Sequence, residues 1–401
     1  AESFAISALD ELSIDATREQ IHAAIETSLA GKLDQSMGKH LANLALDAGE
    51  IIVNEGRADP TMVKVIKQTG GSMNQTALIT GLALAKSKIH PEMNERGGPG
   101  SILLLDGGIE RRKTQLDTKL NITSAGMIDA FRKSESKSLL SQVENLVEIG
   151  CDLLVCKEGI DEEARQSLSN NGILTYRRVE KKDLDLLSRA CGANLVPDAG
   201  RAGKGDLGAF IKTREELRGG INNWILDAED GGATLIVRGS TDGILDEVER
   251  CFADGLGVAC QLLEDPVLLP GAGATQVALA RRLRRHAESV PGREQMAIEA
   301  FAGALEVIPR TLAENAGLDP VNTIIDLRKA HSEGLSTYGV NVYDGGVVDM
   351  AESRVYEPSR VVEQAVQSAS ETAVMILRID DVISSKGGGG MDGADFDGFD
   401  M

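Results

Sequence analysis

Residues 1–68 show the spacing of apolar positions that is typical of amphipathic helices. Asp15 predicts the N-cap of a helix over Ala16–Ala30, and Gly31 is a natural stop for it. A second helix is expected over Asp34–Ala48, and a short third helix over Pro60–Gln68. The chain therefore opens with a small helical block.

The pattern changes at residue 70, where short apolar runs begin to alternate with helical stretches. This alternation predicts an α/β domain with parallel strands that ends near residue 238. The expected strands are Ala77–Ala85, Ser101–Asp106, Asp152–Cys156, Ile173–Arg177, Asn194–Val196 and Thr234–Arg238. The expected helices are Gly126–Ile149, Asp161–Asn170 and Lys181–Gly192.

Helical periodicity returns after residue 238. An amphipathic helix is expected over Asp242–Leu263, and a second over Arg293–Ala316, in which Pro309 predicts a bend. Asp319-Pro320 is typical of an N-cap followed by the first helical residue, and predicts a helix that runs to about Lys329.

A hairpin and a last helix complete the pattern. Asn341–Tyr343 and Val347–Asp349 flank Asp344-Gly345-Gly346, which predicts a hairpin, and Pro358 predicts the start of a helix that reaches about Ser384. Residues 387–401 are rich in glycine and acidic residues, and we expect them to be disordered. The order helical, α/β, helical predicts a multidomain α and α/β protein, in which the first helical block packs against the third.

Composition and charge limit the classes of function that the chain can have. Acidic residues outnumber basic ones by 62 to 42, giving a net charge of −20, so a broad electrostatic surface for nucleic acid is excluded. We recognise neither a signal peptide nor an apolar run of membrane-spanning length, and expect a cytoplasmic protein without a membrane partner. The cysteines form no CxxC motif, and we interpret all five as reduced core residues: Cys151, Cys156, Cys191, Cys251 and Cys260.

The sharpest chemical signal lies in Val267–Arg285, VLLPGAGATQVALARRLRR. A short apolar run leads into Gly271-Ala272-Gly273-Ala274 and then into an amphipathic helix. Glycines allow close approach of the backbone, and the N–H groups of a first helical turn attract phosphate. The motif is neither a Walker A loop nor a complete GxGxxG, so a simple small-residue turn is an equally good interpretation of these residues alone.

The chain resembles the group II chaperonins, the archaeal thermosome subunits and their eukaryotic cytosolic relatives. The resemblance rests mainly on Asp246–Arg285, DEVERCFADGLGVACQLLEDPVLLPGAGATQVALARRLRR, and on Gly292–Arg328, GREQMAIEAFAGALEVIPRTLAENAGLDPVNTIIDLR. Further support comes from Gly339–Pro358, GVNVYDGGVVDMAESRVYEP, and from Gln367–Ile383, QSASETAVMILRIDDVI. The acidic composition is similar to that of a haloarchaeal member.

The resemblance implies a division into domains. Residues 1–69 and 239–266 would form the two halves of the intermediate domain, the first including the end of an equatorial segment. Residues 70–238 would form the apical, substrate-binding domain, with a helical protrusion at about 121–144. Residues 267–386 would form the C-terminal half of the equatorial, ATP-binding domain.

The resemblance also assigns roles to residues. Asp254 would be the catalytic carboxylate that orients or deprotonates the attacking water. Gly271, Ala272 and Gly273 would contact the nucleotide through their backbone. Asn341 and Tyr343 would lie beside the adenine, and Glu357 would accept hydrogen bonds from the ribose hydroxyls.

Met127, Ile128 and Phe131 are apolar residues on an otherwise polar helix. The resemblance implies that these residues contact unfolded substrate or neighbouring lids. Simple packing under the protrusion is an equal alternative. The implied cofactors are ATP and Mg²⁺. The implied partners are unfolded polypeptides and other subunits of a homo- or hetero-oligomeric double ring.

The chain departs from the family in two respects. The GPKG-type phosphate loop and the GDGTT motif, whose aspartate holds the magnesium, occur nowhere in the 401 residues, and the usual GGG is Gly271-Ala272-Gly273. We therefore expect the N-terminal half of the equatorial domain to be missing. The expected function is ATP-driven protein folding, with a passive polypeptide-binding module as the alternative. A Rossmann-like enzyme would need a complete phosphate fingerprint, which the chain lacks.

Overall fold

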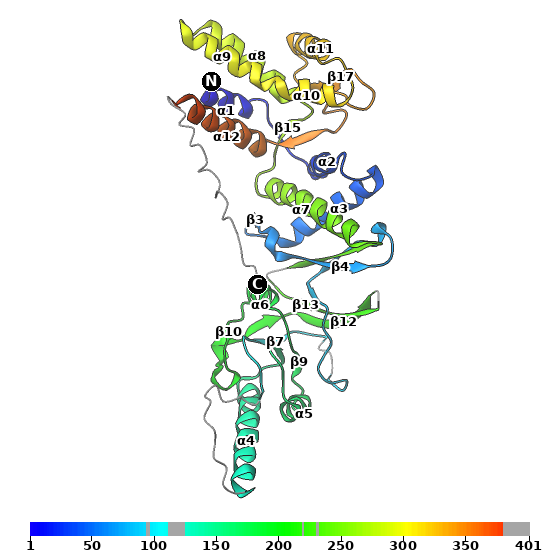
Figure 1. Cartoon of the computed structure of the whole chain (residues 1–401), viewed down its shortest axis with the longest axis vertical. Helices are drawn as coiled ribbons and strands as arrows, with labels where there is room; N and C mark the ends of the chain where they lie inside the picture. Colours follow the sequence, from blue (N-terminus) through cyan, green and yellow to red (C-terminus); the bar gives the residue numbers. More distant parts are fainter. Residues whose placement is uncertain (94–96, 111–124, 219, 230–231, 380–401) are drawn as a thin grey trace, which may run out of the picture. The chain divides into compact units, whose positions relative to one another are not determined.

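The computed structural model describes residues 1–93, 97–110, 125–218, 220–229 and 232–379, and for 125–132 it describes the backbone alone (Figure 1). The chain divides into two compact units. Unit 1 contains residues 1–13, 271–349 and the segment from Ser359 onward, and unit 2 contains residues 14–270 and 350–358.

Three helices form the helical part of unit 2: α2 (Arg18–Leu29), α3 (Gln35–Ile52) and α7 (Asp242–Glu264) (Figure 1). They pack around small and aliphatic side chains and the fully buried Phe252. Gly255 allows α7 to approach α2 closely, because a Cβ there would lie 3.2 Å from Ile25 Cγ2.

The expected N-cap at Asp15 is wrong. Thr17 caps α2 through a capping box with Gln20, and Asp15 belongs to strand β1 (Ile14–Asp15). Strand β15 (Val267–Pro270) pairs antiparallel with β1 on one side and with β18 (Tyr356–Pro358) on the other. Asp15 lies opposite Val267, so a pairing partner about 250 positions away draws it out of the helix.

A parallel sheet forms the centre of the α/β part of unit 2, in the order β10-β7-β8-β9. Its strands are β7 (Gly100–Leu105), β8 (Leu153–Cys156), β9 (Leu174–Tyr176) and β10 (Leu195–Val196), and β11 (Gly208–Phe210) adds antiparallel to β7. Its helices are α4 (Ala125–Ile149), α5 (Glu162–Asn170) and α6 (Lys181–Cys191). The predicted α/β alternation is confirmed.

The expected helix over Pro60–Gln68 is wrong. Pro60–Met62 forms one 3₁₀ turn, and Val63–Thr69 forms strand β4. Strand β14 (Ala233–Gly239) pairs parallel with β4 and antiparallel with β5 (Ala77–Thr80). The β-branched residues of β4 suit a strand, and its partner follows so much later in the sequence that local periodicity did not reveal it.

The predicted single strand Ala77–Ala85 is also wrong, because it breaks at Gly81 into β5 and β6 (Leu82–Leu84). Gly81 has φ +96°, and a Cβ there would lie 2.3 Å from Asp227 Oδ1. Strand β6 joins the antiparallel pair β12 (Lys212–Arg218) and β13 (Ile221–Asp227). In a further small hairpin β2 (Val53–Asn54) pairs with β3 (Arg57–Ala58).

Unit 1 is mainly helical. It contains α1 (Glu2–Asp10), α8 (Ala274–Glu288), α9 (Arg293–Leu305), α10 (Val307–Asn315), α11 (Pro320–Ser332) and α12 (Ser359–Leu377). Asp319 caps α11 and Pro320 begins it, as predicted. The last helix, predicted to reach about Ser384, ends at Leu377, and Arg378 and Ile379 follow it as a turn and an irregular residue. The predicted tail and the protrusion residues 121–124 lie outside the described residues.

The expected bend at Pro309 is wrong, because the helix breaks at Glu306 between α9 and α10. Pro309 is the third residue of α10, a position where a backbone N–H has no partner within the helix and proline is tolerated.

The hairpin is present with different strand bounds. Its strands are β16 (Tyr338–Val340) and β17 (Val347–Asp349), so Asn341–Tyr343, expected to be a strand, lie in the turn. Gly345 and Gly346 both have positive φ, which the Gly-Gly pair of the sequence predicts.

The five cysteines are buried and unpaired, which confirms their interpretation as core residues. Burial raises the pKa of the Cys151 thiol to about 12. Among the described helices, none combines the length and the apolarity that crossing a bilayer requires.

Candidate nucleotide site

The Gly-rich bend connects β15 to α8 through two consecutive residues with positive φ. Ala272 has φ +52° and Gly273 has φ +80°. A Cβ on Gly273 would lie 2.5 Å from Pro309 Cβ, so only glycine fits there without displacing the proline. Gly273 is the N-cap of α8, and no side chain caps that helix end.

Two amide groups of this bend have no hydrogen-bond acceptor among the described residues. Within the described part of the chain, no group accepts a hydrogen bond from the N–H of Ala272 or Gly273. Backbone donors beside an uncapped helix N-terminus are the groups that bind phosphate oxygens. The strand, bend and helix predicted from Val267–Arg285 are therefore confirmed as local structure, and the nucleotide contact remains a prediction.

The hairpin turn lies beside the bend in unit 1. The N–H of Val340 donates to the carbonyl oxygen of Ala272 at 3.0 Å. Asn341 follows directly, and its side-chain oxygen accepts from the backbone N–H groups of Tyr343 and Asp344 at 3.1 and 3.2 Å. The Tyr343 residue is 84% exposed. The structure thus brings Asn341 and Tyr343 into the same unit as the bend and connects them to it.

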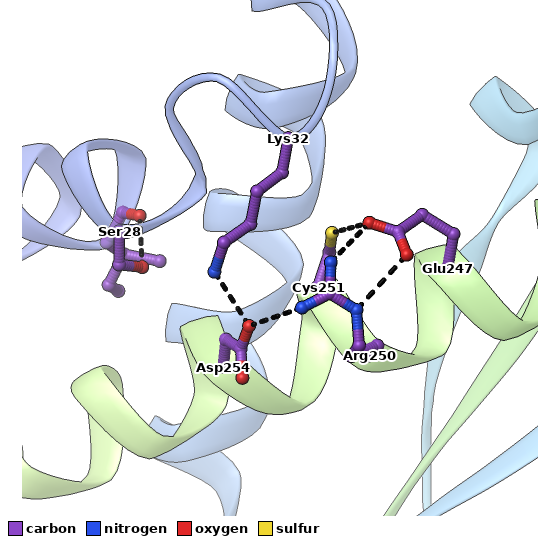
Figure 2. Close-up of polar contacts among 7 residues, drawn as sticks. Ser28, Lys32, Glu247, Arg250, Cys251 and Asp254 are labelled. Carbon is purple, nitrogen blue, oxygen red and sulfur yellow. Dashed lines mark hydrogen bonds and ion pairs between the residues drawn. The ribbon is translucent and has the colours of Figure 1, made fainter. Parts of the chain in front are cut away.

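The predicted catalytic carboxylate lies on α7 in unit 2. Figure 2 shows Asp254 between two cations, Lys32 from the loop that joins α2 to α3 and Arg250 one turn earlier on α7. Lys32 Nζ donates to Asp254 Oδ2 at 2.7 Å, and Arg250 Nη1 lies 3.7 Å from the same oxygen. The Asp254 side chain is 42% exposed, so it is accessible to water.

Arg250 is shared between two carboxylates. It donates to both oxygens of Glu247 at 3.1 and 2.6 Å, and these hydrogen bonds hold the pKa of Glu247 below its usual range. Glu247 also accepts from Cys251 Sγ (Figure 2). Lys32 is therefore the nearer cation of Asp254, and sequence reasoning missed it because the two residues are about 220 positions apart. The only sequence signal at Lys32 was its position directly after Gly31, just beyond the predicted end of a helix.

The remaining predicted residues lie on β18 and on α4. Glu357 lies on β18 opposite Leu269 of β15, in unit 2. Met127, Ile128 and Phe131 lie on the described backbone of α4, but their side chains are outside the described residues. Their contact with substrate therefore stays a prediction. The expected convergence of Asp254, Glu357 and the bend also stays a prediction, since the first two belong to unit 2 and the bend to unit 1.

Comparison with known proteins decides the family. Residues 1–387 match the TCP-1/cpn60 chaperonin family. This chain belongs to that family. Thermosome subunit 1 of Haloferax volcanii is 40% identical over 395 residues, which are 97% of this chain and 70% of the relative. Thermosome subunit beta of Methanothermobacter thermautotrophicus is 39% identical over 385 residues, which are 95% of this chain and 71% of the relative.

A solved structure gives the same result. The open-state monomer of a group II chaperonin from Methanococcoides burtonii superposes with a TM-score of 0.74 at 31% identity, covering 94% of this chain and 91% of that one. The resemblance to group II chaperonins and the multidomain α and α/β fold are confirmed. The relatives include both methanogens and halophiles, so the haloarchaeal assignment remains a prediction.

Proposed function

We propose that this chain is a subunit of an ATP-dependent chaperone that binds unfolded polypeptides and helps them fold inside a double ring. The match of residues 1–387 to the chaperonin family carries this proposal. The similarity to thermosome subunits supports a cytoplasmic assembly of such subunits. The comparisons lend no support to the alternative of a passive binding module.

In this proposal the bend at Gly271–Gly273 contacts the phosphates of ATP. The N–H groups of Ala272 and Gly273 would donate to phosphate oxygens, and the uncapped end of α8 would add its dipole. The adenine would lie near Asn341 and Tyr343, and Glu357 would accept from the ribose hydroxyls. Mg²⁺ would neutralise charge on the phosphates.

Asp254 would act on the water that attacks the γ-phosphate. A carboxylate is suited to this because it accepts hydrogen bonds from water and orients it, while metal and phosphate contacts provide most of the rate. Lys32 and Arg250 hold one oxygen of Asp254 in the present state. The second oxygen, Oδ1, takes part in neither of these two contacts.

The remaining predictions extend the proposal. Residues 70–238 would bind unfolded polypeptide, aided by Met127, Ile128 and Phe131 on the protrusion. Residues 1–69 and 239–266 would connect this apical domain to the equatorial one, 267–386, as the halves of an intermediate domain.

The proposal is tested by two assays on the 401-residue chain, alone and joined to the N-terminal segment of a thermosome relative. The first is Mg²⁺-dependent ATP hydrolysis, and the second is suppression of aggregation of a chemically unfolded client. We expect both chains to bind the client and the joined chain to hydrolyse ATP. Asp254→Asn should lower hydrolysis by about 100-fold or more.

A matched control is available on the same helix. Asp246 also pairs with a lysine, Lys67, at 2.8 Å, and Asp246→Asn should leave hydrolysis near the wild-type rate. Equal losses in the two variants would reject the catalytic role of Asp254. Failure of both chains to bind the unfolded client would reject the chaperone function.

A further inference from the structure

Glu306 is a buried carboxylate at the break between α9 and α10. Its side chain is 1% exposed and receives hydrogen bonds from two arginines. Arg284 of α8 donates to Oε1 and Oε2 at 2.7 Å each. Arg328 of α11 donates to Oε1 at 2.8 Å through Nε and to Oε2 through Nη2. One carboxylate therefore fixes three helical elements with two bidentate arginine contacts.

This geometry is more specific than mere attraction between charges. A guanidinium is planar, so a bidentate contact restrains both the distance and the orientation of the two groups. Buried ion pairs contribute little net stability compared with apolar residues of the same volume. We therefore explain the contact of two arginines with one carboxylate by the helix positions that it fixes, and not by stability alone.

Two contacts lead from Glu306 to the bend. Arg284 lies on α8, the helix that Gly273 begins, so the first arginine anchors the same helix. Pro309 follows Glu306 by three residues on α10 and packs against Gly273, where an added Cβ would be 2.5 Å from Pro309 Cβ. The position of α10 relative to α8 therefore determines how closely Pro309 packs against Gly273 in the bend.

A second contact with the bend comes from the hairpin, which packs on the same helices. The N–H of Val340 donates to Ala272 O, and the Val340 side chain lies in a small apolar cluster. That cluster contains Val277 of α8, Ala313 of α10, and Ile324 and Leu327 of α11. Leu327 is adjacent to Arg328, so α11 is fixed both by the cluster and by Glu306.

We propose that Glu306 is a positioning residue, which sets α8, α10 and α11 so that Pro309 and Val340 hold the Gly271–Gly273 bend in its phosphate-binding shape. The inference rests on the proposed function for the meaning of that shape, but the shape itself can be measured without nucleotide. Glu306 does not contact the ligand and acts through Pro309 and the hairpin.

The test compares Glu306→Gln with Glu11→Gln in the full chain. Glu11 also pairs with an α8 arginine, Arg282, at 2.6 Å, but it is exposed and has no contact with the bend. Hydrogen exchange at the Val340 amide measures the bend directly, and the Leu283 amide in the middle of α8 serves as an internal reference. Binding of a fluorescent ADP analogue measures its function.

We expect Glu306→Gln to speed hydrogen exchange at Val340 by about tenfold relative to Leu283. Glu11→Gln should leave the exchange rates of both amides unchanged. If the bend then holds its binding shape about a tenth of the time, ADP affinity falls about tenfold. Pro309→Ala should have a similar effect, and the double variant should be little worse than either single one, since both act through one contact.

Equal acceleration at Val340 and Leu283 would overturn the proposal, because the loss of stability that both amides share would then account for the whole effect. Additive effects of Glu306→Gln and Pro309→Ala would overturn the route through Pro309. Absence of ADP binding in wild type would count against the proposed function, and the exchange data would still decide the role of Glu306. If Glu306→Gln does not fold, Arg328→Lys keeps the charge without the bidentate contact, and exchange at Val340 that stays at the wild-type rate in this variant overturns the proposal.

Discussion

Removal of the Glu306 carboxylate should produce a stability loss that depends on pH in a defined direction. Burial opposes the ionisation of Glu306, but hydrogen bonds from Arg328 and Arg284 outweigh it and lower its pKa from an ordinary 4.5 to about 2. A difference of about 2.5 pKa units, at about 1.4 kcal/mol each, corresponds to about 3–4 kcal/mol of folding free energy at neutral pH.

The sign follows from proton linkage. The pKa is lower in the folded state, so the unfolded chain binds a proton first as the pH falls. The contribution of Glu306 is therefore complete above about pH 4.5 and is lost as the pH approaches about 2. The Glu306→Gln variant lacks this titration, and the other acidic residues are common to both chains, so their effects cancel in the comparison.

The assay is urea unfolding of the full chain between pH 7 and the lowest pH at which both proteins remain folded. Far-UV circular dichroism follows both units, while the fluorescence of Trp224, the only tryptophan of the chain, reports on unit 2. We expect the free energy of unfolding of Glu306→Gln to be about 3–4 kcal/mol below that of wild type at pH 7 and pH 5, and this difference to narrow below pH 4.5, with the Trp224 transition unchanged.

Two results would refute this reasoning. A gap below about 1 kcal/mol at pH 7 would mean that the arginines do not stabilise the ionised carboxylate beyond its desolvation cost. A gap that stays constant as the pH falls through 4 would mean that loss of packing, and not loss of charge, accounts for the effect.

Three further changes have expected outcomes. Asp254→Asn should lower stability by less than about 1 kcal/mol in thermal unfolding, because its pair with Lys32 is partly exposed, and a larger loss would show that the pair is structural. Ala272→Gly should raise the free energy of urea unfolding by up to about 1 kcal/mol, since relief of the positive φ outweighs the added freedom of glycine in the unfolded chain. A decrease would mean that the methyl group packs favourably. Phe252→Ala should cost about 3–5 kcal/mol in the Trp224-monitored transition because Phe252 is 1% exposed, and a cost under 1 kcal/mol would show that the α2–α3–α7 core collapses around the cavity.

Residue patterns alone predicted the elements whose cause is local. Asp319 caps α11, as predicted, by accepting hydrogen bonds from the amides two and three residues later, and Gly31 adopts the positive φ expected at the end of α2. The bend after Pro270 was also predicted, because Gly273 permits the positive φ with which the chain turns into α8. The motifs of this region also identified the chaperonin family, which the comparisons confirm.

Tertiary structure decided the features that depend on partners far along the chain. Strand β4 exists because β14 pairs with it, and Asp15 leaves its helix because β15 pairs with β1. The ion pair of Lys32 with Asp254 and the two arginines at Glu306 likewise join residues from different elements. Helix caps and turns depend on the dihedral angles and hydrogen bonds of a few neighbouring residues, which the sequence specifies directly. A paired strand or a buried charge is stable only when the whole fold supplies its partner.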